Sequence, residues 1–195
     1  SMPDTVSAAM KGVDKLFLVT PLSLDQVAMK STAIQAAKQA GVKHIVMSTG
    51  IGAGPDAGVE IGRWHGKNQE EIKEAGIVYT FLQPGFFMQN MLMFADSIRN
   101  GGEFYMPLGD SKVSWVDARD IATVGVASLT QDGHENQAYP ITGAEALSCD
   151  EIAKILCDVT GKEINYVDIP LEAAKQGMVG AGMPEKLADL MNELY

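Results

Sequence analysis

Apolar residues along the chain occur in short continuous runs that alternate with longer stretches of helical spacing. Three runs rich in strand-forming residues lie at 15–20, 44–48 and 78–82. Before the second and third runs, Gly41 and Gly76 each close a helix-like stretch, and glycine fits the left-handed residue that ends many helices. Runs that are apolar throughout are typical of strands buried on both faces. The order therefore predicts a parallel sheet covered by helices.

Two helix starts carry a capping-box pattern, a hydroxyl residue followed three positions later by Gln or Glu. The pairs are Ser23 with Gln26 and Ser148 with Glu151. After Pro84-Gly85, apolar residues spaced by three and four predict one face of an amphipathic helix, and these are Phe87, Met91, Phe94, Ala95 and Ile98.

The rest of the chain continues the alternation without a linker. We expect a helix over 118–129, a strand over 138–141, a helix after Ser148, a strand over 164–167 and helix from about 171. The chain is therefore interpreted as a single domain over 1–195. Residues 1–145 form most of the sheet, and 146–195 form most of a small α+β lobe.

Composition narrows the function classes. The formal net charge is −10 and no basic stripe offsets it, which argues against direct nucleic-acid binding. No apolar run approaches the roughly 20 residues of a membrane span, and the first residues lack a signal-peptide pattern, so we expect a cytoplasmic protein. Two cysteines and three histidines without metal-ligand spacing predict no metal site.

Several stretches in the right order resemble the NmrA-like family, a branch of the atypical short-chain dehydrogenases. The resemblance rests on 12–21, 42–49, 83–90, 115–122, 139–143, 150–153 and 181–184. It implies an NAD(P)-binding Rossmann-like protein that acts as an oxidoreductase, with NADP or NAD as the cofactor. It also implies a ligand crevice at the carboxyl ends of the strands.

By position, the resemblance assigns roles to residues that follow the strands. Thr20 and Pro21 would flank the nucleotide, and Ser48 and Thr49 would line the nicotinamide end. The cofactor would be closed over by Gln83, Pro84, Gly85, Phe86 and Phe87. Met88 and Asn90 would face the substrate. For each of these residues, ordinary strand-end or turn chemistry is the alternative.

Two residues on the next helical stretch are candidates for catalysis. Related dehydrogenases carry Tyr and Lys four apart, and here Arg63 stands four before Lys67, so the phenol is absent. Lys67 could hold a ribose hydroxyl, and His65 could act as an acid or a polar contact. A solvated lysine and an ordinary histidine remain the alternatives.

The family's G-x-x-G-x-x-G turn has no counterpart in this sequence, and Gly50 to Gly54 follow the wrong strand to replace it. We therefore expect a truncated Rossmann-like sheet that binds the cofactor weakly or not at all. A sheet lacking its first strand leaves the strand at Leu16 with an open edge, which predicts a homodimer or higher oligomer. A redox-sensing or protein-binding module and an oligomeric remnant are the alternatives to an enzyme.

Overall fold

The structure is a computed structural model that describes residues 3–195. Its contacts divide the chain into two compact units. The first unit runs to Gly85 and resumes over Arg119–Ile141, and the second takes residues 86–118 and 142–195. The division therefore groups residues 86–118 with the C-terminal segment, whereas the sequence prediction placed its internal boundary near residue 145.

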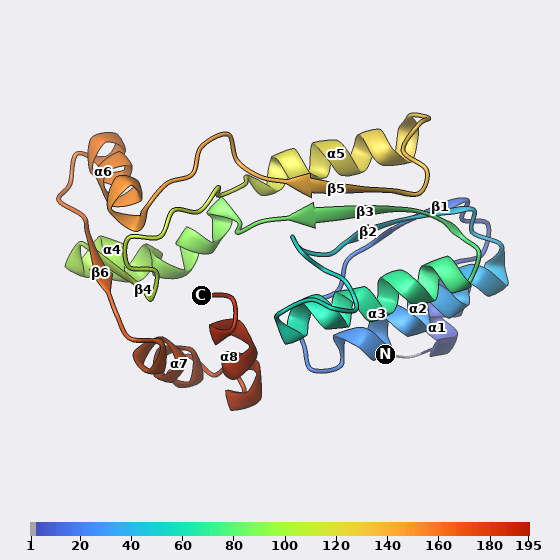
Figure 1. Ribbon diagram of the computed structural model, residues 1–195, viewed down its shortest axis with the longest axis horizontal. Helices are drawn as coiled ribbons and strands as arrows, with labels where there is room; N and C mark the ends of the chain where they lie inside the picture. Colours follow the sequence, from blue (N-terminus) through green and yellow to red (C-terminus); the bar gives the residue numbers. More distant parts are fainter. Residues whose placement is uncertain (1–2) are drawn as a thin grey trace. The chain divides into compact units, whose positions relative to one another are not determined.

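The first unit is a parallel sheet with helices on both faces, as the sequence predicted. The strand order is β1-β2-β3-β5, and every neighbouring pair is parallel. Helices α1 to α3 cover one face and α5 covers the other (Figure 1). The bounds are α1 Pro3–Ala9, β1 Lys15–Leu18, α2 Gln26–Ala40, β2 His44–Ser48, α3 Glu60–Glu74, β3 Val78–Pro84, α5 Ala118–Thr130 and β5 Gln137–Ile141.

Burial explains why these segments are strands. The first four residues of β2 are all buried, because this strand has neighbours on both sides and helices on both faces. Strand β1 pairs only with β2 among the described residues, and only Leu18 of its four residues is buried. Buried side chains from β1, β2, α2 and α3 form the core of this unit, among them Leu18, Ile34, Ala37, Ile45, Met47 and Ile72.

The predicted helix ends are confirmed and one predicted helix start is wrong. Gly41 and Gly76 follow α2 and α3 with φ of 77° and 73°, in the left-handed region. Helix α2 begins at Gln26 instead of after Ser23. The Gln26 side chain is buried against the core, so it does not turn back to complete a capping box.

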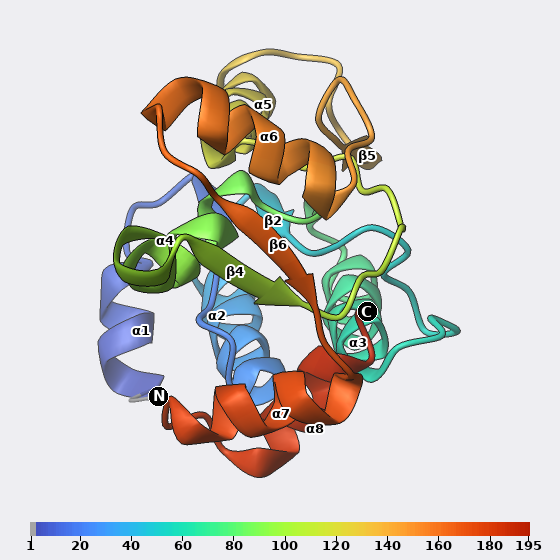
Figure 2. The same ribbon diagram turned by 90° about the vertical axis from the view of Figure 1, so that its left-hand side faces the viewer.

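The second unit contains a two-stranded parallel sheet of β4 (Glu103–Met106) and β6 (Asn165–Asp168), which lie side by side in Figure 2. The helix predicted after Gly85 is a 3-10 helix, η1 (Met88–Phe94), followed by α4 (Ala95–Gly101). The remaining helices are α6 (Cys149–Thr160), α7 (Leu171–Gly180) and α8 (Glu185–Asn192). Strand β4 was not predicted from the sequence. The core of this unit includes Phe104, Met106, Trp115, Cys149, Ile152 and Ile164.

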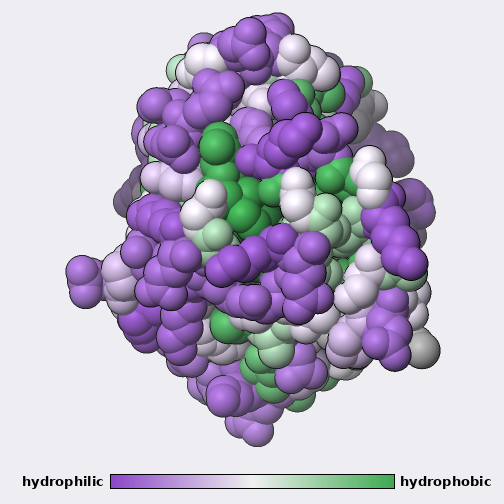
Figure 3. Space-filling view, turned by 90° about the vertical axis from the view of Figure 1, so that its right-hand side faces the viewer, coloured by the Kyte–Doolittle hydropathy of each residue, from purple (hydrophilic) through white to green (hydrophobic). Residues whose placement is uncertain are grey.

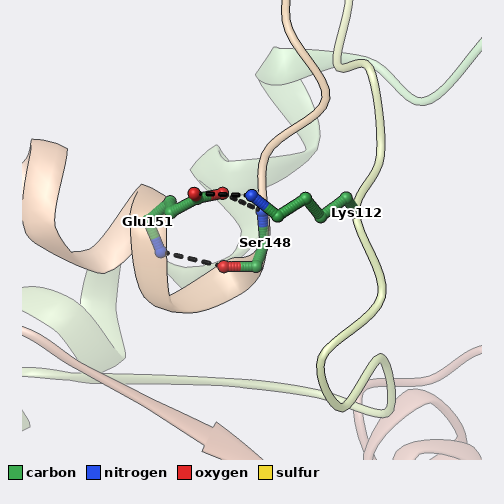
Figure 4. Close-up of polar contacts among 3 residues, drawn as sticks. All are labelled: Lys112, Ser148 and Glu151. Atoms are coloured by element: carbon green, nitrogen blue, oxygen red, sulfur yellow. Dashed lines mark hydrogen bonds and ion pairs between the residues drawn. The ribbon is translucent and has the colours of Figure 1, made fainter.

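The predicted capping box at the start of α6 is confirmed. The amide of Glu151 donates to Oγ of Ser148 at 3.2 Å, and the amide of Ser148 donates to Oε2 of Glu151 at 2.8 Å. Nζ of Lys112 lies 2.7 Å from Oε1 of the same carboxylate (Figure 4). This arrangement ties the loop before α6 to the helix and satisfies two backbone amides that would otherwise lack partners.

Most residues on the face drawn in Figure 3 are hydrophilic, around an apolar area near its centre. Within residues 3–195, no helix is both long and apolar enough to cross a bilayer. Cys149 and Cys157 are free thiols on α6.

Candidate functional site

The carboxyl ends of β1, β2 and β3 meet at one edge of the first unit's sheet. Leu18 pairs with Met47, and Ser48 pairs with Leu82, so the residues that follow each strand emerge at the same level. The structure thus brings three predicted groups to this edge, and they are Thr20 with Pro21, Ser48 with Thr49, and Gln83 through Gly85. Open parallel sheets bind ligands at this edge.

Thr20 and Pro21 follow β1, and of the three groups they are the least tied to the rest of the unit by hydrogen bonds. The Thr20 side chain is partly exposed, but its Oγ1 atom is buried and has no hydrogen-bond partner among the described residues. Pro21 is exposed. A buried hydroxyl without a partner is uncommon in folded proteins. Such an atom is suited to form a hydrogen bond with a bound ligand or a water molecule.

Thr49 has a different environment. Its amide and its Oγ1 both donate to the carbonyl of Leu82, at 2.8 and 3.0 Å, and the residue is buried. The Thr49 hydroxyl therefore ties the end of β2 to β3. Ser48, one residue earlier, is only partly buried, and its carbonyl oxygen accepts a hydrogen bond from another residue of this unit.

The end of β3 is held by its backbone. The amide of Gly85 donates to the carbonyl of Ile141 at 3.0 Å, and the carbonyl of Pro84 accepts from the amide of Ile51 at 3.1 Å. Pro84 is buried and Gln83 is partly exposed. The loop after β2 is thereby tied to the end of β3, which fixes the backbone that borders this edge.

The residue that donates to the Ser48 carbonyl is a buried lysine, Lys30, which was not among the site residues predicted from the sequence. Lys30 on α2 is 2% exposed. Its ammonium donates to the Ser48 carbonyl at 3.3 Å and lies 2.9 Å from Nδ1 of His65 on α3. Burial lowers the pKa of Lys30 to about 8. Burial, followed by the nearby Lys30 charge, lowers the pKa of His65 to about 3.

The sequence contained a signal for Lys30. Residues 26, 30, 33, 34 and 37 fall on one buried face of α2, so a lysine stands at a position where the helix otherwise places core side chains. Lysine is almost never fully buried without a functional or structural partner. Gln26, one turn earlier on the same face, is also buried, and its Nε2 atom lacks a partner among the described residues.

Lys67, the second predicted catalytic residue, lies away from His65. Two positions separate them on α3, which places them on opposite sides of the helix. Lys67 is exposed and lines an open hollow of about 320 Å³ together with Pro55, Glu60, Arg63 and Trp64. The structure does not bring the two predicted catalytic side chains together.

The loop between β2 and α3 is packed closely against the helix that carries His65. The Arg63 guanidinium donates to the carbonyls of Ala57 and Gly58, at 2.8 and 3.1 Å. Gly66 faces the backbone of Gly54, where an added Cβ would lie 2.2 Å from the carbonyl carbon. A glycine at position 66 is thus required for this approach, which sets the distance between the loop and α3.

The remaining predicted residues belong to the second unit. Phe86 packs its ring against Trp115 and Tyr195, with centroids 5.5 and 5.9 Å apart. The amide of Met88 donates to the carbonyl of Val116, and the Met88 side chain is exposed. Phe87 and Asn90 are partly buried at the start of η1. These residues border the segment that leaves β3, and their roles in binding stay predictions.

Among the described residues, neither the metal-ligating side chains nor the Cys149 thiol indicates a metal site or a nucleophilic site. Among residues 3–195, no group of three or more His, Cys, Asp or Glu side chains is placed to hold a metal ion. Burial, followed by the charge of Asp150, raises the pKa of the Cys149 thiol to about 11, so this thiol is a poor nucleophile.

The chain is similar to several known reductases. It is 63% identical over 193 residues to an NAD(P)H azoreductase from Xenophilus azovorans, covering 99% of this chain and 68% of that protein. The triphenylmethane reductase of Citrobacter sp., solved with NADP(H), superposes with a TM-score of 0.84 at 27% identity, covering 100% of this chain and 69% of that one. The NADPH-dependent quinone oxidoreductase QOR2 of Escherichia coli, solved with NADPH, gives 0.86 at 26% identity, covering 98% and 68%.

Other curated relatives are covered over 62% and 65% of their length, so the chain spans about two thirds of the proteins it matches. The model of the NmrA-like family matches residues 3–195, which is the whole described part of the chain. The fold agrees, since the parallel sheet with helices on both faces is that of the Rossmann-like reductases named above. The chain therefore belongs to the NmrA-like family, whose members similar to it include NAD(P)H-dependent reductases.

Proposed function

We propose that this protein is an NAD(P)H-dependent oxidoreductase that reduces small conjugated acceptors of the azo or quinone kind. The observation that carries the proposal is the 63% identity to an NAD(P)H azoreductase over 99% of the chain. Identity at that level, spread over the whole chain, argues against the expectation of weak cofactor binding, which rested only on the glycine motif that this sequence does not contain. We therefore propose that the protein binds the dinucleotide.

The strand-end edge of the first unit fits such a ligand. Thr20 offers a hydroxyl that has no partner in the described part of the chain, Pro21 offers an exposed apolar surface, and Ser48 is partly accessible. A bound reduced nicotinamide would supply a hydride. Thr20 and Ser48 would hold polar groups of the dinucleotide, and Gln83, at the end of β3, would limit its movement at the same edge.

His65 is the proton donor in this proposal. Because its pKa is lowered to about 3, the imidazole is neutral at physiological pH and carries one N–H. A neutral N–H can donate a hydrogen bond to an acceptor oxygen or nitrogen as negative charge develops there. Lys67 lies on the other side of α3 and lines a separate hollow, so this proposal gives it no part in holding the ribose. The substrate-facing roles of Met88 and Asn90 stay predictions from the family resemblance.

Binding and turnover of the purified chain test the proposal. NADPH and NADH would be titrated while the fluorescence of Trp64 and Trp115 is followed, and nicotinamide oxidation would be measured with a benzoquinone and with a carboxylated azo dye. We expect saturable binding and turnover. We also expect His65→Asn to lower kcat by about 100-fold, whereas Lys67→Met, on the opposite side of α3, should leave kcat unchanged. Binding without turnover of either acceptor would favour a non-enzymatic redox sensor, and absence of binding would refute the proposal.

We also propose that a second copy of the chain covers the free edge of β1. Within the described residues this strand has one neighbour, and Phe17 and Val19 are 44% and 58% exposed beside it. Unpaired strand edges with apolar side chains recruit other strands. Light scattering at micromolar concentration should therefore give the mass of a dimer or larger oligomer, and Phe17→Lys should shift it toward the monomer. A monodisperse wild-type monomer would overturn this proposal.

A further inference from the structure

The buried contact between Lys30 and His65 connects helix α2 to helix α3 in the first unit. The ammonium has three N–H donors and no acceptor, and two of its neighbours are Nδ1 of His65 at 2.9 Å and the carbonyl of Ser48 at 3.3 Å. Among residues 3–195, no carboxylate forms an ion pair with Lys30. The charge is thus held by an imidazole and a carbonyl, which is an uncommon environment for a lysine that is 2% exposed.

This contact has a consequence for the imidazole. An ammonium can only donate, so Nδ1 of His65 must present its lone pair to Lys30. In a neutral imidazole the other ring nitrogen, Nε2, then carries the proton. Within the described part of the chain, no group hydrogen-bonds Nε2, and the residue as a whole is only partly buried. The N–H of His65 therefore remains available to a ligand.

We propose that Lys30 is a positioning residue that fixes His65 as the Nε2–H tautomer and replaces the proton that His65 gives to the acceptor. The proposal rests on the proposed function for the source of the hydride. It assigns a role to a residue that has no place among the predicted cofactor or substrate contacts, and it explains why a lysine occupies a core position of α2.

The proton balance is as follows. Once reduction has left negative charge on an oxygen or nitrogen of the acceptor, that atom would take the proton from Nε2 of His65. Lys30 gives a proton to Nδ1, which leaves a neutral amine and an imidazole that is again neutral, now with the proton on Nδ1. The starting state returns when the amine takes back the Nδ1 proton and Nε2 takes one from water. No carboxylate takes part.

The surroundings of the pair agree with this role. At the interface of α2 and α3, the carboxylate of Glu71 accepts hydrogen bonds from Ser31 at 2.6 Å and from Gln35 at 3.0 Å. Asn68 of α3 donates to the carbonyl of Val27 at 3.2 Å. From β2, the Ser48 carbonyl faces the ammonium. The lowered pKa of Lys30, about 8, leaves the ammonium mostly charged at neutral pH and yet able to release its proton.

The tautomer can be measured without cofactor or turnover. The full chain would be labelled with ¹⁵N-histidine, and the His65 signals would be assigned with His65→Gln. Below pH 7 we expect Nδ1 in the range of an unprotonated ring nitrogen and Nε2 in the range of a protonated one. In Lys30→Met the two signals should move toward averaged values, and the pKa of His65 should rise because a neighbouring positive charge is gone.

Two further variants separate the role from mere packing. Lys30→Arg keeps a cationic donor and should restore the wild-type signals at least in part. Lys38→Met removes an exposed lysine from the same helix and should leave the His65 signals unchanged. If Lys30→Met fails to fold, the wild-type titration still decides the question, because the tautomer preference should be lost as the pH rises through about 8, where Lys30 releases its proton.

The outcomes separate this inference from the proposed function. A wild-type Nδ1–H tautomer at neutral pH, or a tautomer unchanged in Lys30→Met, would overturn the inference even if the protein turns over. The expected tautomer in a protein that binds no dinucleotide would support the positioning and refute the function. In an active protein, kcat should decline above about pH 8 in the wild type, whereas Lys30→Met should lower kcat by about 10- to 100-fold and remove that decline.

Discussion

The contact between Gly66 and the loop after β2 allows a prediction of opposite sign to the usual effect of Gly→Ala in a helix. Alanine is favoured over glycine in a helix interior by about 1 kcal/mol. At position 66 of α3, however, the new Cβ would lie 2.2 Å from the carbonyl carbon of Gly54, 2.4 Å from its oxygen and 2.5 Å from the nitrogen of Pro55. All three are backbone atoms, so no side-chain rotation relieves the overlap.

Ordinary contact between such atoms begins near 3.5 Å, so the loop would have to retreat by roughly 1 Å. Overpacking of this kind costs about 1–3 kcal/mol, to which the helix preference of alanine is opposed. We therefore expect Gly66→Ala to lower the free energy of unfolding by up to about 2 kcal/mol, which is up to roughly 8 °C in Tm for a chain of this length.

Gly125→Ala is the matched control. Gly125 lies inside helix α5 of the same unit, and its added Cβ would meet its nearest atoms, from Phe17 and Leu82, at 3.4 and 3.5 Å, which is ordinary contact. We expect this variant to be as stable as the wild type or more stable. Thermal and urea unfolding followed by circular dichroism would measure both. If Gly66→Ala proved at least as stable as Gly125→Ala, the close approach of α3 and the loop would be refuted.

Three further predictions concern a cap, the core and the buried lysine. Ser148→Ala should cost about 1 kcal/mol of unfolding free energy, because α6 loses its capping box; Ser148→Asp should retain most of that stability in urea unfolding, and an unchanged midpoint for the alanine variant would contradict the assignment. Ile72→Ala should cost about 2–5 kcal/mol since the side chain is fully buried, whereas Val159→Ala, 78% exposed, should change the midpoint little. For Lys30, the folded state binds fewer protons than the unfolded state between pH 8 and 10.5, so stability rises with pH over that window. The rise should reach about 3 kcal/mol relative to Lys30→Met, and equal pH profiles for the two proteins would contradict the burial of the charge.

Elements with strong local patterns could be predicted from the sequence. Strand β2 is apolar throughout because it is buried on both faces, and the capping box at Ser148 formed because Glu151 is free to turn back toward the cap. The same pattern failed at Ser23, where the Gln26 side chain is held in the core. Strand β4 was not predicted, because it is held by its pairing with β6, a strand far away in the sequence. Tertiary contacts decided these two cases, and a local pattern does not contain them.

The candidate site also has a part that could be predicted from the sequence and a part that could not. The residues that follow the strands could be placed at one edge from the sequence, because the carboxyl ends of parallel strands always meet. The hydrogen bonds made there could not be predicted: Thr49 uses its hydroxyl to hold β3, whereas the hydroxyl of Thr20 has no partner among residues 3–195. Likewise, the sequence offered His65 and Lys67 as two catalytic candidates on one helix, and helical geometry places them on opposite sides of α3.

Lys30 is a charged residue at a position of α2 where a core side chain would be expected. Desolvation opposes the charged form of Lys30, as its lowered pKa records, and a methionine of similar length would fill the same space without that cost. A stability argument alone therefore does not account for a lysine at this position of α2. Residues that break a local rule tend to mark functional sites, because there the chemistry outweighs the loss of stability. Lys30 contacts His65 and the end of β2, at the edge where open parallel sheets bind ligands. The proposed role of Lys30, to fix the proton of His65 on Nε2, therefore explains its position better than packing does.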